Sequence, residues 1–172
     1  MTWEFILKFR LPPDGTAPAG WLDALYEAGC DDATVGVGKP GTIALDFSRE
    51  ADSAEAAVRS AIKDVERAIP GAVLAEVGPD LVNLADLGEI TGCSRQNIRK
   101  YAAGEIKAAK APFPEPVHTG NPSLWRLAEV LPWFHRNTDL RPDPALLELA
   151  RVTSAMNLDI QRQRLNHLLA AE

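Results

Sequence analysis

The chain has 172 residues and a mass of 18.6 kDa, enough for one ordinary domain or two small ones and too little for a large catalytic fold. Its 46% hydrophobic and 24% charged residues match an average globular protein and exclude a disordered or fibrous chain. The formal net charge of −6 argues by itself against a nucleic-acid partner, because an acidic protein repels phosphate.

The N-terminal segment begins with a strand and a helix. Apolar and charged side chains alternate over residues 3–11, which is the pattern of a half-buried strand. After a turn at Pro12-Pro13-Asp14-Gly15, apolar residues recur at helical spacing from Trp21 to Ala28 and stop at Gly29. We therefore expect a strand, a turn and a short helix.

A hairpin, a second helix and a last strand follow. Two β-like runs, residues 33–37 and 42–47, are joined by the turn sequence Gly-Lys-Pro-Gly. Asp52 with Glu55 predicts a capping box for a helix whose apolar face ends near Ile69, and residues 72–77 read as a strand. The order βαββαβ predicts a ferredoxin-like α+β domain over residues 1–79.

One motif in this segment formally matches the dinucleotide fingerprint G-x-G-x-x-G. It spans Gly36 to Gly41. The fingerprint needs a helix N-terminus after it to receive the pyrophosphate, whereas residues 42–47 alternate like a strand. We therefore reject nucleotide binding at this loop.

Positive charge is concentrated in the middle of the chain. Residues 94–110 carry five basic residues against Glu105 alone, although the whole chain is acidic. Such an asymmetry indicates that one element meets a polyanion while the rest keeps the protein soluble.

The same region predicts two short helices joined by a tight turn. Asn83 and Ser94 are suited to cap the two helices, and Gly92 permits the turn between them. We expect four apolar residues to face a shared core: Leu87, Ile90, Ile98 and Tyr101. The outward side chains of the second helix suit base edges and phosphates: Arg95, Gln96, Asn97, Arg99 and Lys100. The plainer alternative is a polar face that is merely solvated.

Five motifs give this region a resemblance to a known family. Ser94–Tyr101 (SRQNIRKY) and Gly104–Ile106 (GEI) resemble the recognition helix and the start of the wing in MerR-type regulators. Phe113–Val117 (FPEPV), Leu124–Arg126 (LWR) and Val130–Phe134 (VLPWF) resemble the wing and closing helix of excisionase-type winged helix-turn-helix proteins. The resemblance covers about residues 81–135.

The resemblance implies a mode of DNA binding. The helix from Ser94 to Ala103 would enter the major groove, and the wing near Thr119–Trp125 would lie beside phosphates or the minor groove. Residues 105–123 are longer and richer in proline than a MerR wing, and an extra domain precedes the motif, so wing contacts and effector logic do not carry over.

Trp125, Trp133 and Phe134 are interpreted as core residues of the small domain, since aromatic burial dominates the stability of such domains. Arg126 follows an inward tryptophan, so it is free to touch a phosphate or is a solvated surface arginine.

The C-terminal segment, residues 137–172, keeps apolar spacings of three and four from Pro142 onward and predicts one long amphipathic helix. Its stripe would pack on the middle domain, residues 80–136, or on a second copy.

Nothing in the sequence supports catalysis, a metal or a cofactor. Cys30 and Cys93 are far apart, and the three histidines are scattered. Asp31 and Asp32 are expected to be solvated or to form a turn. The N-terminus lacks the apolar run of a signal peptide or membrane helix, so we expect a cytoplasmic protein that joins the nucleoid when bound to DNA.

The leading hypothesis is a non-enzymatic, sequence-specific DNA-binding protein, a transcriptional regulator that acts as a homodimer on double-stranded DNA. Its predicted contact set comprises Ser94, Arg95, Gln96, Asn97, Arg99, Lys100, Lys107, Lys110 and Arg126. The alternative is a protein-interaction adaptor or an antitoxin-like protein, whose N-terminal domain binds a protein partner. That domain could also sense a ligand or only stabilise a dimer.

Overall fold

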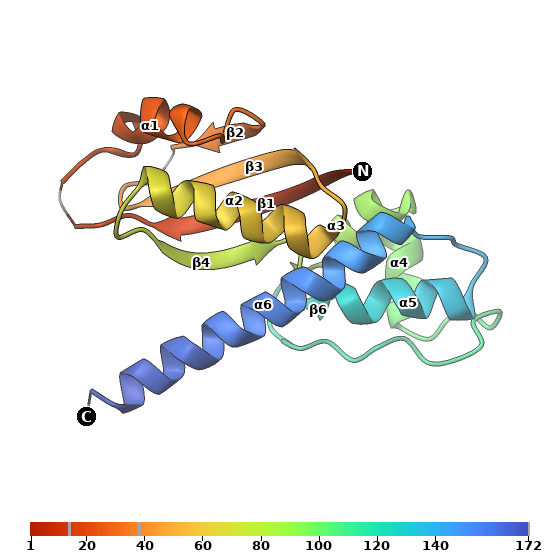
Figure 1. The fold of residues 1–172 in the computed structure, drawn as a ribbon. Helices are drawn as coiled ribbons and strands as arrows, with labels where there is room; N and C mark the ends of the chain where they lie inside the picture. Colours follow the sequence, from red (N-terminus) through yellow and green to blue (C-terminus); the bar gives the residue numbers. More distant parts are fainter. Residues whose placement is uncertain (14, 38, 172) are drawn as a thin grey trace. The chain divides into compact units, whose positions relative to one another are not determined.

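A computed structural model describes residues 1–13, 15–37 and 39–171. It is a mixed α+β structure with a four-stranded antiparallel sheet, a two-stranded sheet and, in the described residues, six α-helices (Figure 1). The chain forms two compact units. Unit 1 comprises Met1–Gly78 and Ala155–Glu172, and unit 2 comprises Pro79–Ser154.

The sheet of unit 1 has the strand order β2-β3-β1-β4, with every neighbouring pair antiparallel. Its strands are β1 (Thr2–Arg10), β2 (Ala33–Gly36), β3 (Thr42–Glu50) and β4 (Val73–Gly78). The predicted strands are confirmed, and β3 runs three residues beyond its predicted end. Asp14 of the first predicted turn and Gly38 of the hairpin and of the G-x-G-x-x-G motif lie outside the described residues.

One face of this sheet is buried because alternate residues of β1 and β3 are apolar. The inward side chains are Trp3, Phe5, Leu7 and Phe9 of β1 and Ile43, Leu45 and Phe47 of β3. The helix α2 (Ala54–Ala68) packs on β1 and β3, and the helix α1 (Leu22–Glu27) packs against α2 and against a short 3-10 turn, η1 (Pro18–Trp21). The helix predicted to end at Gly29 is confirmed, and Gly29 has a φ of 91°.

The predicted capping box of α2 is wrong. Ser53, not Asp52, is the N-cap residue, and its hydroxyl accepts a hydrogen bond from the Ala56 N–H at 3.2 Å. A side chain can cap only from the position at which the backbone is still extended, and Ser53 holds that position with φ −148° and ψ 158°. The predicted apolar face is otherwise confirmed from Val58 to Ile69.

Arg49 is a buried charge at the end of β3, with 7% of its surface exposed. Its guanidinium donates to both carboxylate oxygens of Asp32 at 2.7 and 3.0 Å, and to one oxygen of Asp64 at 2.7 Å. Hydrogen bonds to Ser60 and to the Gly29 carbonyl engage its remaining donors. The expected turn is confirmed, because Asp31 and Asp32 both lie in one. The solvated alternative is wrong for Asp32, because its carboxylate binds this arginine.

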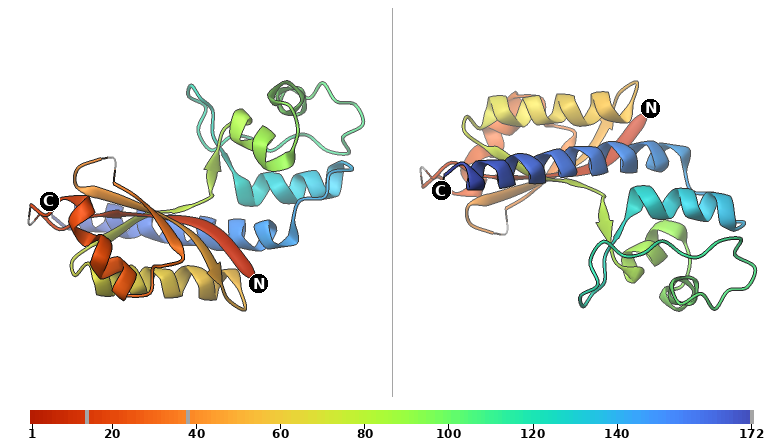
Figure 2. Two further views of the ribbon diagram at one scale, coloured as in Figure 1. Left: turned by 90° about the horizontal axis from the view of Figure 1, so that it is seen from above. Right: turned by 90° about the horizontal axis from the view of Figure 1, so that it is seen from below.

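The long helix α6 (Pro144–Leu169) contributes residues to both units and is unbroken in both views of Figure 2. The single C-terminal helix is confirmed, but residues 137–172 do not form a separate unit. Within unit 1, Asn157 binds the backbone of Val77 on strand β4: its amide donates to the carbonyl at 2.7 Å and accepts from the N–H at 2.8 Å. This pair of bonds satisfies backbone groups on an edge strand.

Unit 2 holds the helix pair predicted from the sequence. Its elements are β5 (Leu81–Val82), α3 (Leu84–Thr91), α4 (Arg95–Ala102), β6 (Trp125–Arg126), α5 (Leu127–Asn137) and the start of α6. Its core joins Leu87 and Ile98 of the two short helices to Trp133 and Phe134 of α5. The prediction that Trp125, Trp133 and Phe134 are core residues is confirmed.

Candidate nucleic-acid interface

The turn between α3 and α4 is built by the residues that the sequence singled out. Asn83 caps α3 by accepting hydrogen bonds from the N–H groups of Ala85 and Asp86, and the Asp86 carboxylate accepts from the Asn83 N–H. Gly92 ends α3 with a φ of 69°, in the left-handed region that favours glycine. Ser94 caps α4 through the N–H of Asn97 at 3.2 Å. All three predictions are confirmed.

Gly88 brings the two helices close together, a role that sequence reasoning missed. A Cβ at this position would lie 2.9 Å from the carbonyl oxygen of Cys93 and 3.4 Å from the Arg95 nitrogen. Both atoms belong to the backbone, so a larger residue could be accommodated only if the turn moved. The signal in the sequence is a glycine inside a helical stretch, which costs about 1 kcal/mol relative to alanine and therefore indicates a packing reason.

The inner sides of both helices enter the core of unit 2 as predicted. Leu87 and Ile98 are fully buried, and Ile90 and Tyr101 pack against the same cluster. Tyr101 meets Trp133 and Phe134 edge to face, with ring centroids 5.7 and 5.4 Å away. These contacts fix which side of α4 faces outward.

The outer side of α4 is polar and cationic. Arg95, Gln96, Arg99 and Lys100 are exposed, while Asn97 is half-buried. No hydrogen bond or ion pair engages the side chains of these five residues within the described part of the chain. Their donors are therefore available to another molecule.

A long loop with little regular structure follows α4, and Figure 2 shows how far it extends from the helices. Lys107 and Lys110 lie in its first part; both are exposed and form no ion pair within the described residues. Farther along, the backbones of His118 and Leu124 pair as an antiparallel bridge. The chain then enters β6, which pairs with β5. The hairpin closed by the bridge between His118 and Leu124 is where the sequence predicts the wing.

Arg126 differs from its sequence expectation. Its side chain is 14% exposed, and one guanidinium nitrogen donates to both carboxylate oxygens of Asp80 at 3.0 and 2.9 Å. The Asp80 carboxylate also accepts a hydrogen bond from the Ser154 hydroxyl at 2.5 Å. Arg126 is thus neither free for a phosphate nor solvated, and we remove it from the candidate contact set. Asp80 lies 46 residues away in the chain, so no local pattern could reveal the pair.

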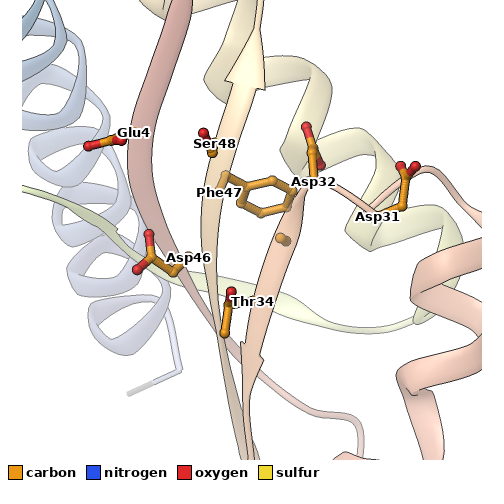
Figure 3. A pocket seen from close by; sticks show the side chains of 8 residues that line it. Glu4, Asp31, Asp32, Thr34, Asp46, Phe47 and Ser48 are labelled. Carbon is orange, nitrogen blue, oxygen red and sulfur yellow. The ribbon is translucent and has the colours of Figure 1, made fainter.

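One hollow on unit 1 has the opposite charge character. It has a volume of about 500 Å³, and Figure 3 shows Glu4, Asp46, Ser48 and Thr34 around it, with Asp31 and Asp32 at one end. Carboxylates dominate this lining, so the hollow would repel a phosphate. It is an unsuitable surface for nucleic acid.

Neither a metal site nor a membrane-spanning helix is found in the described residues. No group of three or more His, Cys, Asp and Glu side chains there is placed to hold a metal ion. In the same part of the chain, no helix combines the length and the apolar character needed to cross a membrane. Both cysteines are free thiols.

Comparison of the chain with protein-family models, curated proteins and solved structures finds no match. The site must therefore be interpreted from its own geometry and charge.

Proposed function

We propose that the protein is a sequence-specific DNA-binding protein, and that it acts as a transcriptional regulator. The observation that carries the proposal is the outward face of α4, whose polar and cationic side chains have no partners within the described residues. Arg95, Gln96 and Arg99 would read base edges in the major groove, where arginine pairs with guanine and glutamine with adenine. Lys100, Lys107 and Lys110 would contact phosphates.

The architecture favours a winged helix-turn-helix interpretation of unit 2. Two short helices with a left-handed glycine between them match the recognition motif, and the hairpin around His118 and Leu124 would be the wing. For unit 1, the strand order and the βαββαβ element order favour a ferredoxin-like arrangement. The resemblance to MerR-type and excisionase-type proteins belongs to the same proposal, as does a cytoplasmic location with nucleoid association on DNA.

The exposed end of α6 supports a homodimer. Four leucines on one side of the helix are exposed by 51 to 62%: Leu158, Leu165, Leu168 and Leu169. Burying such side chains against a second copy gains hydrophobic free energy, at about 25 cal/mol for each Å² removed from water. A dimer would read two half-sites about 34 Å apart, so its operator would be palindromic.

The experiment begins with selection of bound duplexes from a randomised pool, followed by fluorescence anisotropy on the selected sequence. We expect Arg95→Ala and Arg99→Ala each to weaken specific binding by about tenfold or more, because a bidentate contact to a base contributes about 1–3 kcal/mol. The control is Arg59→Ala, which removes an exposed helical arginine from unit 1. Failure of the selection at low salt, or equal binding by all three variants, would refute the proposal.

The salt dependence of DNA binding distinguishes the lysines that we expect to contact phosphates from Arg126, which is paired with Asp80. The log–log slope of affinity against salt changes by about 0.9 for each phosphate contact that is lost. Lys107→Ala should therefore flatten the slope by about that amount per protomer, whereas removal of the Arg126 charge should not flatten it.

The leucine face of α6 also favours a second function, an adaptor or antitoxin-like protein that binds a protein partner. Light scattering of the wild type and of Leu165→Glu tests the homodimer, with Gln163→Glu as the charge-matched control. The adaptor function would be favoured if the wild type is a monomer that does not bind DNA and if Arg95→Ala leaves its binding to a protein partner unchanged.

A further inference from the structure

A small hollow lies between α4, the loop that follows it and α5. Its volume is about 350 Å³, at the lower end of the range of small-molecule sites. Six of its lining residues carry the argument: Tyr101, Ile106, Lys107, Lys110, Phe113 and Trp133. None of the expectations drawn from the sequence assigns a ligand to it.

The apolar part of the lining is aromatic and fixed by packing. Phe113 and Trp133 meet edge to face with their ring centroids 4.9 Å apart. The Trp133 indole N–H donates to the Pro112 carbonyl at 2.6 Å, so this tryptophan is held in place with its donor engaged. Only the 5% of its surface that is exposed can border the hollow. Such a lining suits a flat aromatic group.

The polar part of the lining is cationic and unengaged. Lys107 and Lys110 form no ion pair within the described residues. The Tyr101 hydroxyl has no hydrogen-bond partner there either, and burial, with smaller contributions from Cys93 and Asp139, raises the pKa of this phenol above its ordinary value. Tyr101 therefore remains a protonated donor at neutral pH.

We propose that this hollow binds a small aromatic carboxylate. The ring would lie against Phe113 and Trp133, and the carboxylate would meet the two lysines and the Tyr101 hydroxyl. An adjoining hollow of about 90 Å³ shares Tyr101 and Lys110 but also contains Asp139, which repels an anion. The carboxylate consequently belongs in the larger hollow.

Lys107 and Lys110 are also proposed phosphate contacts, so the ligand would compete with DNA for the same charges. Only this competition rests on the proposed function. Binding of the carboxylate itself does not depend on it and can be measured on the full chain without DNA.

The test is a titration of the full chain with naphthalene-2-carboxylate. Binding is monitored through the nuclear magnetic resonance signal of the Trp133 indole N–H. We expect a saturable shift, which Lys107→Ala combined with Lys110→Ala weakens by about tenfold and Tyr101→Phe by about threefold. Tyr101→Phe retains the ring contacts with α5, so the fold is preserved. Lys63→Ala, which removes an exposed lysine of unit 1, should change nothing.

Two further probes separate the proposed site from general attraction. Inorganic phosphate should leave the Trp133 signal unchanged, because it cannot use the aromatic wall. The uncharged naphthalene-2-carboxamide should bind at least about tenfold more weakly than the carboxylate. Equal binding of carboxylate and carboxamide, a shift that does not saturate, or full affinity in the double lysine variant would each overturn the proposal. These outcomes leave the DNA-binding proposal unaffected, since no DNA is present.

Discussion

Replacing Asp80 by alanine should destabilise unit 2 far more than the loss of an exposed carboxylate. The Asp80 and Arg126 side chains are 3% and 14% exposed, and Arg126 and Ser154 both donate to the carboxylate. Removing one partner of a buried pair costs about 3–5 kcal/mol, because the other charge stays behind without compensation. Arg126 can regain some hydration through its exposed fraction, so we expect about 3 kcal/mol.

Hydrogen exchange measured by mass spectrometry resolves this loss, because it reports on unit 2 separately from unit 1. Amides of α5 that exchange only on unfolding of unit 2 should lose about a hundredfold in protection, since each 1.4 kcal/mol is a factor of ten. The control is Glu76→Ala. Its partner is Lys8, and the two side chains are 54% and 50% exposed, so the loss should stay below about 1 kcal/mol.

A second variant shows whether the loss reflects an uncompensated charge or only an altered shape. Asp80→Leu combined with Arg126→Met removes both charges and should restore most of the stability, because an apolar pair replaces a buried ion pair at little cost. Equal protection in Asp80→Ala and Glu76→Ala would refute the reasoning. A double variant as unstable as Asp80→Ala would refute it as well.

Three further predictions concern single residues. Gly88→Ala should lower the free energy of unfolding by about 1–2 kcal/mol in urea titration, because overpacking against the backbone outweighs the gain in helix propensity. Asn157→Ala should speed amide exchange at Val77, which donates to the asparagine, by about tenfold relative to wild type. Burial raises the pKa of Cys30 to about 11, so alkylation at pH 9 should reach Cys93 first and Cys30 only after unfolding.

Local patterns made much of the fold predictable. The alternation in β1 predicts its buried face, because successive side chains of a strand point to opposite sides. Asn83, Gly92 and Ser94 predict the two helix ends and the turn, because capping and a positive φ depend only on neighbouring residues. The outward donors of α4 follow from the same helical periodicity, once Ile98 is placed in the core.

The charged interior was not predictable in the same way, because its partners are distant in sequence. Asp80 and Arg126 are 46 residues apart, and only the tertiary fold brings them together. For Arg49 the sequence does contain a signal. This arginine continues the inward alternation of β3 beyond Phe47, so a charged residue occupies a position at which the pattern predicts a buried apolar residue. A buried charge needs a partner, and that requirement points to an acid on a neighbouring element.

The distribution of charge has a consequence for the proposed function. Non-specific DNA affinity rises with the number of phosphates that a protein neutralises. On α4 and the loop that follows it, this chain has only a few basic side chains that are not in ion pairs, and its net charge is −6. General attraction to DNA should therefore be weak, and base contacts by Arg95, Gln96 and Arg99 would have to supply most of the discrimination. Because Arg126 is held by Asp80, it adds nothing to this attraction. A regulator of this kind should dissociate readily from unrelated sequences at physiological salt and remain bound at the sites whose bases it reads.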